Sequence, residues 1–263
     1  MNPQNKIAKH FRSLHQPGDP IILTNAYDAA TATIIASLPT AHAVATASFA
    51  IASTIGVDDT ALTKTQNLSA LKSITSAVHA VNRTKPVTVD LQDGYGSVAE
   101  LSATIQEVIE LGVVGCNIED LDSETGELRA LDDAVARVRA VVRAAAEAGV
   151  PDFVVNARTD VLYQDGMGIQ DAVVRGRAFL EAGACTVFVW GGPGGRGVSG
   201  DEVRELVRDL GGMVNVKLTL GDGFLDVQQL RDLGVARISV GPELWKAAMK
   251  TFQQQAEILL SPY

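Results

Sequence analysis

The segment Val87–Gly96 combines the pattern of a buried strand with acidic residues that could bind a metal ion. It opens as a β-branched run and closes in a Gly-Tyr-Gly turn, and Asp90, Gln92 and Asp93 fall where the strand should end. Carboxylates at that point are costly to desolvate unless a cation or a hydrogen-bond network compensates them. The segment therefore predicts a polar site at the end of a strand.

A second strand end of the same kind follows along the chain. The apolar run Val113–Ile118 leads directly into Glu119 and Asp120. Oxygen ligands at two neighbouring strand ends suit a hard divalent cation, Mg²⁺ or Mn²⁺. The alternative is that each aspartate caps the N-terminus of the next helix. The recurrence of the pattern favours the metal. Its candidate ligands are the oxygen-bearing side chains at these two strand ends, Asp90, Gln92, Asp93, Asn117, Glu119 and Asp120.

Other polar or small residues also follow apolar runs. Arg158 could hold a carboxylate, and free amide groups at Ala47, Ser48 and Phe49 could stabilise an enolate or another oxyanion. The alternative for Arg158 is a salt bridge with Asp160 or Glu119. Further candidates at or near predicted strand ends are Asp59, Asn117 and Asn215, of which the two asparagines could contact a substrate.

Repeated helix endings explain how these residues come together. Five segments end in Glu/Asp-Leu/Ala-Gly and are followed at once by an apolar run, because glycine supplies the left-handed residue that ends a helix. The expected strands are Ile21–Thr24, Ala41–Thr46, the run from Val87, Val113–Ile118, Phe153–Asn156, Cys185–Val189, Met213–Val216 and Ala236–Val240. Eight apolar strands alternating with helices predict one (β/α)₈ barrel of TIM type over residues 1–263, with an open doubly wound sheet as the alternative. An amphipathic helix at Asn2–His15 precedes it.

Bulk properties exclude several partners. The formal net charge of −9 argues against nucleic acid or an anionic membrane as the main partner. No apolar stretch is long enough to span a bilayer, and Met1–Gln16 lacks the apolar core of a signal peptide, so we expect a cytoplasmic protein. Cys116 and Cys185 lie in strand-like runs and are expected to be reduced core residues.

Two further features bear on mechanism. The polar segment Leu121–Ala130 directly follows Glu119 and could be a mobile lid or an ordinary surface loop. The four histidines (His10, His15, His42 and His79) all fall away from predicted strand ends. A histidine acid or base is therefore not expected.

At these residues the chain resembles the isocitrate lyase/phosphoenolpyruvate mutase superfamily. The resemblance runs from about Asn25 to Ala248. It rests on seven short motifs in order: Asn25–Ala30, Ala45–Ser48, Gly56–Asp59, Asp90–Gly96, Asn117–Asp120, Ala157–Asp160 and Arg237–Gly241.

The resemblance implies a (β/α)₈ barrel that binds Mg²⁺ and a small 2-oxo or 2-hydroxy carboxylate. It implies that Asp90 is the main metal carboxylate, with Glu119 a second ligand through water, and that Arg158 holds the substrate carboxylate. It also implies oxyanion binding by the amides around Ser48, and Asp59 near the reacting group. A homodimer or homotetramer that exchanges its C-terminal helix is expected.

The sequence departs from the superfamily pattern at four places. Ala47 takes a position often occupied by serine, with Ser48 next to it. Gln92 stands where many members have a second acidic residue, so that Asp93 could take its place. Trp190 stands where mutase-like members carry histidine. The segment Leu121–Ala130 lacks the Lys-Lys/Arg-Cys-Gly-His lid motif of the isocitrate and methylisocitrate lyases, and these two activities are not expected.

Three functions follow from this reading. The first is Mg²⁺-dependent carbon–carbon cleavage or decarboxylation of a small oxo or hydroxy (di)carboxylate through a pyruvate-type enolate. The second is chemistry at the P–C bond of phosphonopyruvate. This function is disfavoured because the chain has Trp190 where mutase-like members have a histidine. The third is a barrel that binds a metabolite without turnover.

Overall fold

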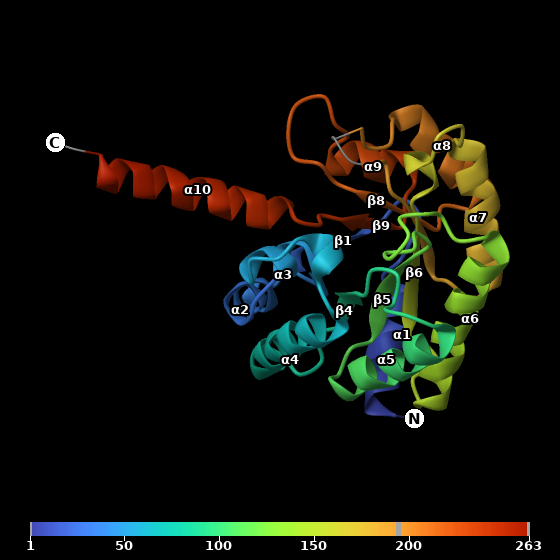
Figure 1. The fold of residues 1–263 in the computed structure, drawn as a ribbon, viewed down its shortest axis with the longest axis horizontal. Coiled ribbons are helices and arrows are strands. Elements are labelled where there is room, and N and C mark those ends of the chain that lie inside the picture. Colours follow the sequence, from blue (N-terminus) through green and yellow to red (C-terminus); the bar gives the residue numbers. More distant parts are fainter. Residues whose placement is uncertain (1, 193–195, 262–263) are drawn as a thin grey trace.

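The computed structural model describes residues 2–192 and 196–261, and parallel strands surrounded by helices form its body (Figure 1). The strands are β1 (Ile21–Leu23), β2 (Asn25–Ala26), β3 (Val44–Thr46), β4 (Val87–Asp90), β5 (Gly115–Glu119), β6 (Val154–Thr159), β7 (Thr186–Val189), β8 (Val214–Lys217) and β9 (Arg237–Ser239). The helices are α1 (Pro3–Ser13), α2 (Ala29–Ser37), α3 (Ser48–Thr54), α4 (Lys64–Val81), α5 (Val98–Glu110), α6 (Leu131–Glu147), α7 (Ile169–Glu181), α8 (Gly200–Asp209), α9 (Val227–Leu233) and α10 (Glu243–Leu260).

The sheet closes on itself through its first strand. β1 and β2 are two parts of one strand interrupted at Thr24, and they pair in parallel with opposite ends of the sheet. Ile22 of β1 is in register with Ile238 of β9, and Asn25 of β2 is in register with Ala45 of β3. Counting β1 and β2 as one strand gives eight in the described part of the chain, which confirms the (β/α)₈ barrel and excludes the open sheet.

The predicted helix endings are confirmed at the backbone. Gly112, Gly149, Gly183, Gly211 and Gly234 all have positive φ, from +61° to +105°. That conformation is favourable for glycine and ends each helix just before the next strand. The repeated glycines therefore account for the strict alternation of helix and strand.

Two helices differ from the sequence-based expectation. The sequence pattern predicts a helix over Leu68–Asn82, and in the structure that helix begins at Lys64, because Thr63 and Gln66 form a capping box at its start. The small-residue stretch after β3 forms helix α3, which was not predicted because its alanines and serines have no amphipathic pattern.

Helix α1 covers the N-terminal ends of the strands. The Gln4 side chain donates to the carbonyl oxygens of Ile109 and Val113, at 2.8 and 2.9 Å, and Arg12 donates to the carbonyl oxygen of Phe153. This confirms the leading helix. It closes one end of the barrel and leaves the carboxyl ends of the strands as the open mouth.

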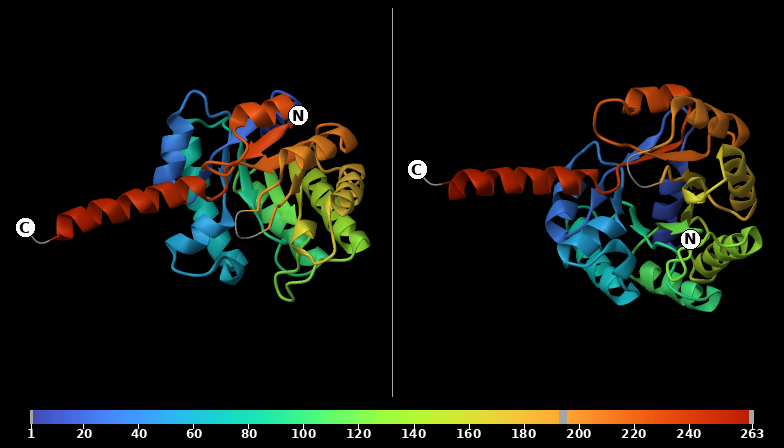
Figure 2. Two further views of the ribbon diagram at one scale, coloured as in Figure 1. Left: turned by 90° about the horizontal axis from the view of Figure 1, so that it is seen from above. Right: turned by 45° about the horizontal axis from the view of Figure 1, so that its top comes forward.

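Helix α10 differs from the other helices because it projects away from the barrel (Figures 1 and 2). Glu243 at its start is the one residue of this helix that is buried. Phe252 is 71% exposed and Leu259 is 80% exposed. Its apolar side chains therefore lack a covering surface within the described chain.

Two sequence expectations concern the molecule as a whole. None of the described helices is both long and apolar enough to cross a membrane. Cys116 and Cys185 are buried free thiols, as predicted.

Candidate active site

A cavity of about 470 Å³ lies at the carboxyl ends of the strands, where barrel enzymes place their chemistry. Seven predicted site residues line it: Ala47, Ser48, Phe49, Asp59, Asp90, Asn117 and Arg158. Gln92, Glu119 and Asn215 do not. The cavity also takes in residues from β7, β8 and the start of α10, which the sequence did not mark as a group.

Asp90 enters the cavity at the end of β4. Its Oδ2 accepts a hydrogen bond from the Ser48 backbone amide at 3.2 Å, and the Asn67 side chain holds its carbonyl oxygen at 2.9 Å. The Ser48 amide, predicted to bind an oxyanion, is therefore already engaged by a carboxylate. Burial and the nearby charge of Asp90 raise the pKa of Asp59 above its usual value. The two carboxylates thus form an acidic side of the cavity.

The side-chain amide of Gln92 points toward Asp59. Its backbone φ of +52° turns the chain after β4, and its Nε2 donates to the carbonyl oxygen and to Oδ1 of Asp59, at 2.8 and 3.2 Å. An amide NH₂ group is a donor only, so this contact orients Asp59 instead of binding a cation. The structure thus gives Gln92 a contact that supports Asp59, while the ligand role of its Oε1 stays a prediction.

Arg158 is bound by two carboxylates of the protein. Its Nε and Nη2 donate to the two oxygens of Asp160 at 2.6 and 2.8 Å, and its Nη1 lies 2.9 Å from Oε2 of Glu119. Both ion pairs that the sequence left open as the alternative are present, while the guanidinium still lines the cavity. Glu119 pairs with Arg158 and does not line the cavity, so its role as a metal ligand through water stays a prediction.

Aromatic rings enclose the same guanidinium. The Arg158 Cζ lies 4.5 Å from the centroid of the Trp190 ring and 5.7 Å from that of Phe188. This stacking is a cation–π contact and shields the ion pairs from water. Trp190 therefore has a defined role at a position where sequence reasoning noted only a missing histidine.

The two candidate asparagines differ in placement. Asn117 lines the cavity, and its Oδ1 accepts hydrogen bonds from Asn156 and Arg237 at 2.7 and 3.1 Å. Asn215 is 0% exposed and does not line the cavity. Its expected contact with substrate is corrected, because the side chain is enclosed inside the barrel below the mouth.

Asp93 and the proposed lid are tied to each other away from the cavity. Arg129 lies 2.9 Å from Oδ2 of Asp93 and 2.9 Å from Oδ2 of Asp122. A bridge between Leu121 and Leu128 folds the segment into a hairpin. No residue of Leu121–Ala130 lines the cavity, and Asp93 is not available as a substitute for Gln92. In this conformation the segment is an anchored surface loop.

Three charged residues at the mouth escaped the sequence analysis as a unit. Glu243 accepts from Lys217 at 3.0 Å and from Lys246 at 3.1 Å. Burial alone would raise the pKa of Glu243, but these hydrogen bonds hold it below its usual value. Lys217 was recognisable as a strand-end residue, whereas Glu243 joins it only because α10 starts beside β8.

The donor set suits Mg²⁺ with few protein ligands. In the described part of the chain no three His, Cys, Asp or Glu side chains lie together as a metal cage. Mg²⁺ usually keeps several waters and uses one or two carboxylates together with substrate oxygens. Asp90, with Asp59 nearby, fits that description, because the mutual repulsion of their charges favours a cation between them.

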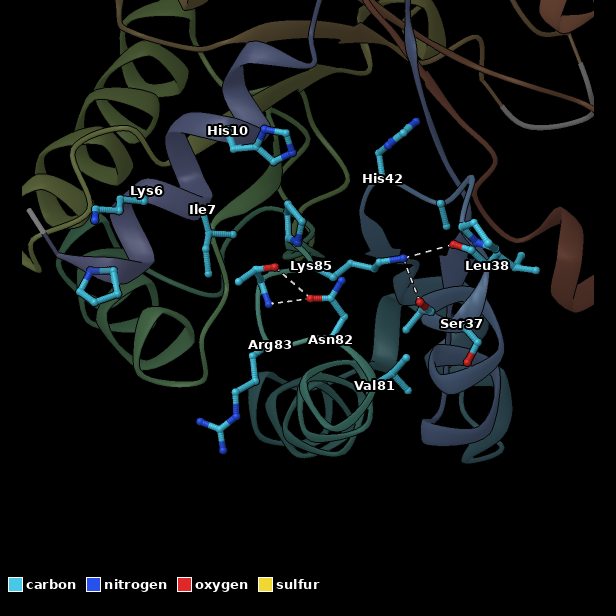
Figure 3. A pocket seen from close by; sticks show the side chains of 16 residues that line it. Lys6, Ile7, His10, Ser37, Leu38, His42, Val81, Asn82, Arg83 and Lys85 are labelled. Atoms are coloured by element: carbon cyan, nitrogen blue, oxygen red, sulfur yellow. Dashed lines mark hydrogen bonds between the residues drawn. The ribbon is translucent and has the colours of Figure 1, made fainter.

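A second cavity, of about 880 Å³, lies beside the N-terminal ends of β3 and β4 (Figure 3). His10 and His42 line it, and the Lys85 ammonium donates to the carbonyl oxygens of Ala36 and Leu38 near the end of α2. The Lys85 ammonium therefore satisfies backbone carbonyls at the C-terminal end of a helix, which have no partner within that helix. The N-terminal face of a barrel contributes stability, so the candidate active site is the smaller cavity at the other end.

Comparisons with known proteins show what the chain is similar to. An uncharacterized protein of Mycobacterium tuberculosis is 31% identical over 242 residues, which cover 91% of this chain and 84% of that protein. An oxaloacetate decarboxylase of Paraburkholderia xenovorans is 28% identical over 203 residues, covering 73% of this chain and 63% of the decarboxylase. The solved structure of a candidate phosphonomutase from Burkholderia cenocepacia J2315 superposes with a TM-score of 0.86 at 35% identity, covering 97% of this chain and 98% of that one.

The family model described as phosphoenolpyruvate phosphomutase matches residues 11–260, almost the whole chain. That range contains every strand of the barrel and every residue of the cavity. The chain therefore belongs to the phosphoenolpyruvate phosphomutase family and is an enzyme of the isocitrate lyase/phosphoenolpyruvate mutase superfamily.

Proposed function

We propose that this protein is a Mg²⁺-dependent carbon–carbon lyase that cleaves or decarboxylates a small 2-oxo or 2-hydroxy dicarboxylate through a pyruvate-type enolate. The observation that carries the proposal is that the Asp59 and Asp90 carboxylates line the same cavity as several cationic side chains. Such a cavity suits an anionic substrate bridged to a cation. The similarity to an oxaloacetate decarboxylase supports the reaction class.

The residues of the chain would divide the work as follows. Asp90 would hold Mg²⁺, which when bound would supply positive charge beside the developing enolate oxygen. Asp59, kept in place by Gln92, has a raised pKa and is the group best suited to hold or return a proton. Phe49 and Trp190 would restrict water at the mouth. Without a lid acid, the proton for the enolate would come from water, with Asp59 passing it on.

A specific observation keeps P–C chemistry as the second candidate. Lys217 and Lys246 give the cavity ammonium groups that could bind a phosphonate dianion. These two ammonium groups would supply the positive charge that a histidine at position 190 would otherwise give. Phosphonopyruvate therefore belongs in the same substrate panel as the dicarboxylates.

The test is pyruvate release from oxaloacetate, phosphonopyruvate, 2-methylisocitrate and alkylated malates at a fixed Mg²⁺ concentration. Oxaloacetate also decarboxylates with Mg²⁺ alone, so each rate is corrected by a reaction without protein. We expect release from a dicarboxylate and its loss on chelation with EDTA. Release of pyruvate and phosphate from phosphonopyruvate alone, or its conversion to phosphoenolpyruvate followed by ³¹P NMR, would select the second candidate. Binding without turnover of any substrate would leave a metabolite-binding barrel.

We also propose that the chain forms a homodimer or homotetramer in which α10 packs on a neighbouring subunit. The support is the row of exposed apolar residues on α10, including Phe252 and Leu259. The double substitution Phe252→Glu and Leu259→Glu is expected to shift the sedimentation coefficient to that of a monomer. Lys250→Glu, on the same exposed helix, should leave assembly unchanged. A monomeric wild-type protein would refute the proposal.

A further inference from the structure

The cationic side chains of the active-site cavity differ in how far protein carboxylates already neutralise their charge. Three cationic side chains of the described residues line it: Arg158, Lys217 and Lys246. Arg158 already faces two carboxylates, with all three of its nitrogens engaged. Its positive charge is therefore more than compensated by protein groups before any substrate enters.

The lysines carry the excess charge instead. Both ammonium groups share one carboxylate, and both contact the same oxygen, Oε1 of Glu243. Two positive charges against one negative charge leave a net positive charge at this side of the cavity. An anionic group of the substrate would find its strongest attraction here.

Lys217 is the better positioned of the two. Its side chain is 24% exposed, against 52% for Lys246, so its charge is less screened by water. It stands at the carboxyl end of β8, and its stem passes over Gly241, where an added Cβ would lie 3.3 Å from the Lys217 Cε. The strand, the glycine and Glu243 together fix the direction of the ammonium group.

We infer that Lys217 is the specificity-determining residue that binds the second carboxylate of a dicarboxylate substrate, with Glu243 as its positioning residue. The inference rests on the proposed function, because it assigns the distal anionic group of that same substrate. In this assignment the cavity has two sides, one for each end of the substrate. Asp90 and Asp59 face the reacting 2-oxo or 2-hydroxy end, and Lys217 selects compounds with a second negative group.

A purely structural role would be a bridge from β8 to α10. That role is satisfied by one lysine and one carboxylate, and it gives no preference for a ligand. The excess charge from Lys246 and the opening of Lys217 to the cavity are not explained by it. The two roles differ in a measurable way, because only substrate binding depends on the number of carboxylates in the ligand.

The test is calorimetric binding of racemic malate and racemic lactate, in the presence of Mg²⁺, to wild type and to Lys217→Met. The two ligands share a 2-hydroxy carboxylate and differ by the distal carboxylate. We expect Lys217→Met to weaken malate binding by about tenfold to a hundredfold and to leave lactate binding within about twofold. Lys217→Arg should restore part of the malate affinity because it retains the charge.

The matched control is Lys250→Met, which removes an exposed lysine from α10 and should change neither affinity. Thermal unfolding shows whether each variant folds, and Lys217→Gln provides a second neutral variant. Equal weakening of both ligands, or no change in malate binding, would overturn the inference. Malate binding through Lys217 without turnover of any oxo acid would reject the proposed function alone. Turnover of oxaloacetate with an unchanged KM in Lys217→Met would reject the inference alone.

Discussion

Asp90→Ala is expected to lower kcat/KM by about 10²- to 10³-fold or more on whichever oxo acid the enzyme accepts. Asp90 is the carboxylate at the end of β4 that lines the cavity and has no cationic side chain hydrogen-bonded to it in the described chain. Removing it takes away the principal charge available to hold Mg²⁺. The loss should persist at raised Mg²⁺ concentration, and the assay is initial-rate pyruvate release corrected for the reaction without protein.

Asp90→Asn separates this loss of function from a loss of stability, because it should not destabilise the barrel. The charges of Asp90 and Asp59 repel each other, so a neutral residue at position 90 removes an unfavourable interaction. Asparagine also keeps a side-chain oxygen that can accept from the Ser48 amide, whereas Asp90→Ala leaves that amide without its acceptor. Residues kept for function commonly have this cost in stability.

Asp58→Ala is the matched control for Asp90. Asp58 is an exposed carboxylate next to Asp59, outside the cavity lining, and its side chain caps no helix. Its removal should leave kcat/KM within about twofold, since surface changes away from such features have small effects. If Asp90→Ala kept more than a tenth of the wild-type rate, catalysis would not depend on a cation held at this strand end.

The predictability of Asp90 has a physical reason. A strand buried on both faces is mostly apolar, so a carboxylate at its end stands out in the sequence. Its partners were not predictable in the same way. The orientation of Gln92 depends on a left-handed backbone at a residue that is not glycine, and no sequence pattern marks that turn.

The barrel itself was readable because the signal repeats. Each glycine that ends a helix carries little information alone, but five of them, each just before an apolar run, indicate the alternation of helix and strand. The cluster of Lys217, Glu243 and Lys246 shows where such reasoning stops. It depends on how the last strand delivers α10 to the mouth, which is tertiary geometry.

Arg158 illustrates the same limit and is the subject of the second large effect. The sequence offered two interpretations, a substrate clamp and a salt bridge, and the structure shows the guanidinium held by Asp160 and Glu119 while it lines the cavity. The side chains of Asp160 and Glu119 are 0% and 13% exposed. Each would lose its nearest positive charge if the arginine were removed.

Arg158→Met is therefore expected to lower the free energy of unfolding by about 3–5 kcal/mol, because breaking a buried ion pair from one side leaves uncompensated buried charge. The measurement is urea denaturation at neutral pH. Arg177→Met is the control: Arg177 is 56% exposed and pairs with Asp209, so its loss should cost no more than about 1 kcal/mol. A loss below about 1 kcal/mol for Arg158→Met would show that water reaches both carboxylates, and would make Arg158 free to bind substrate instead.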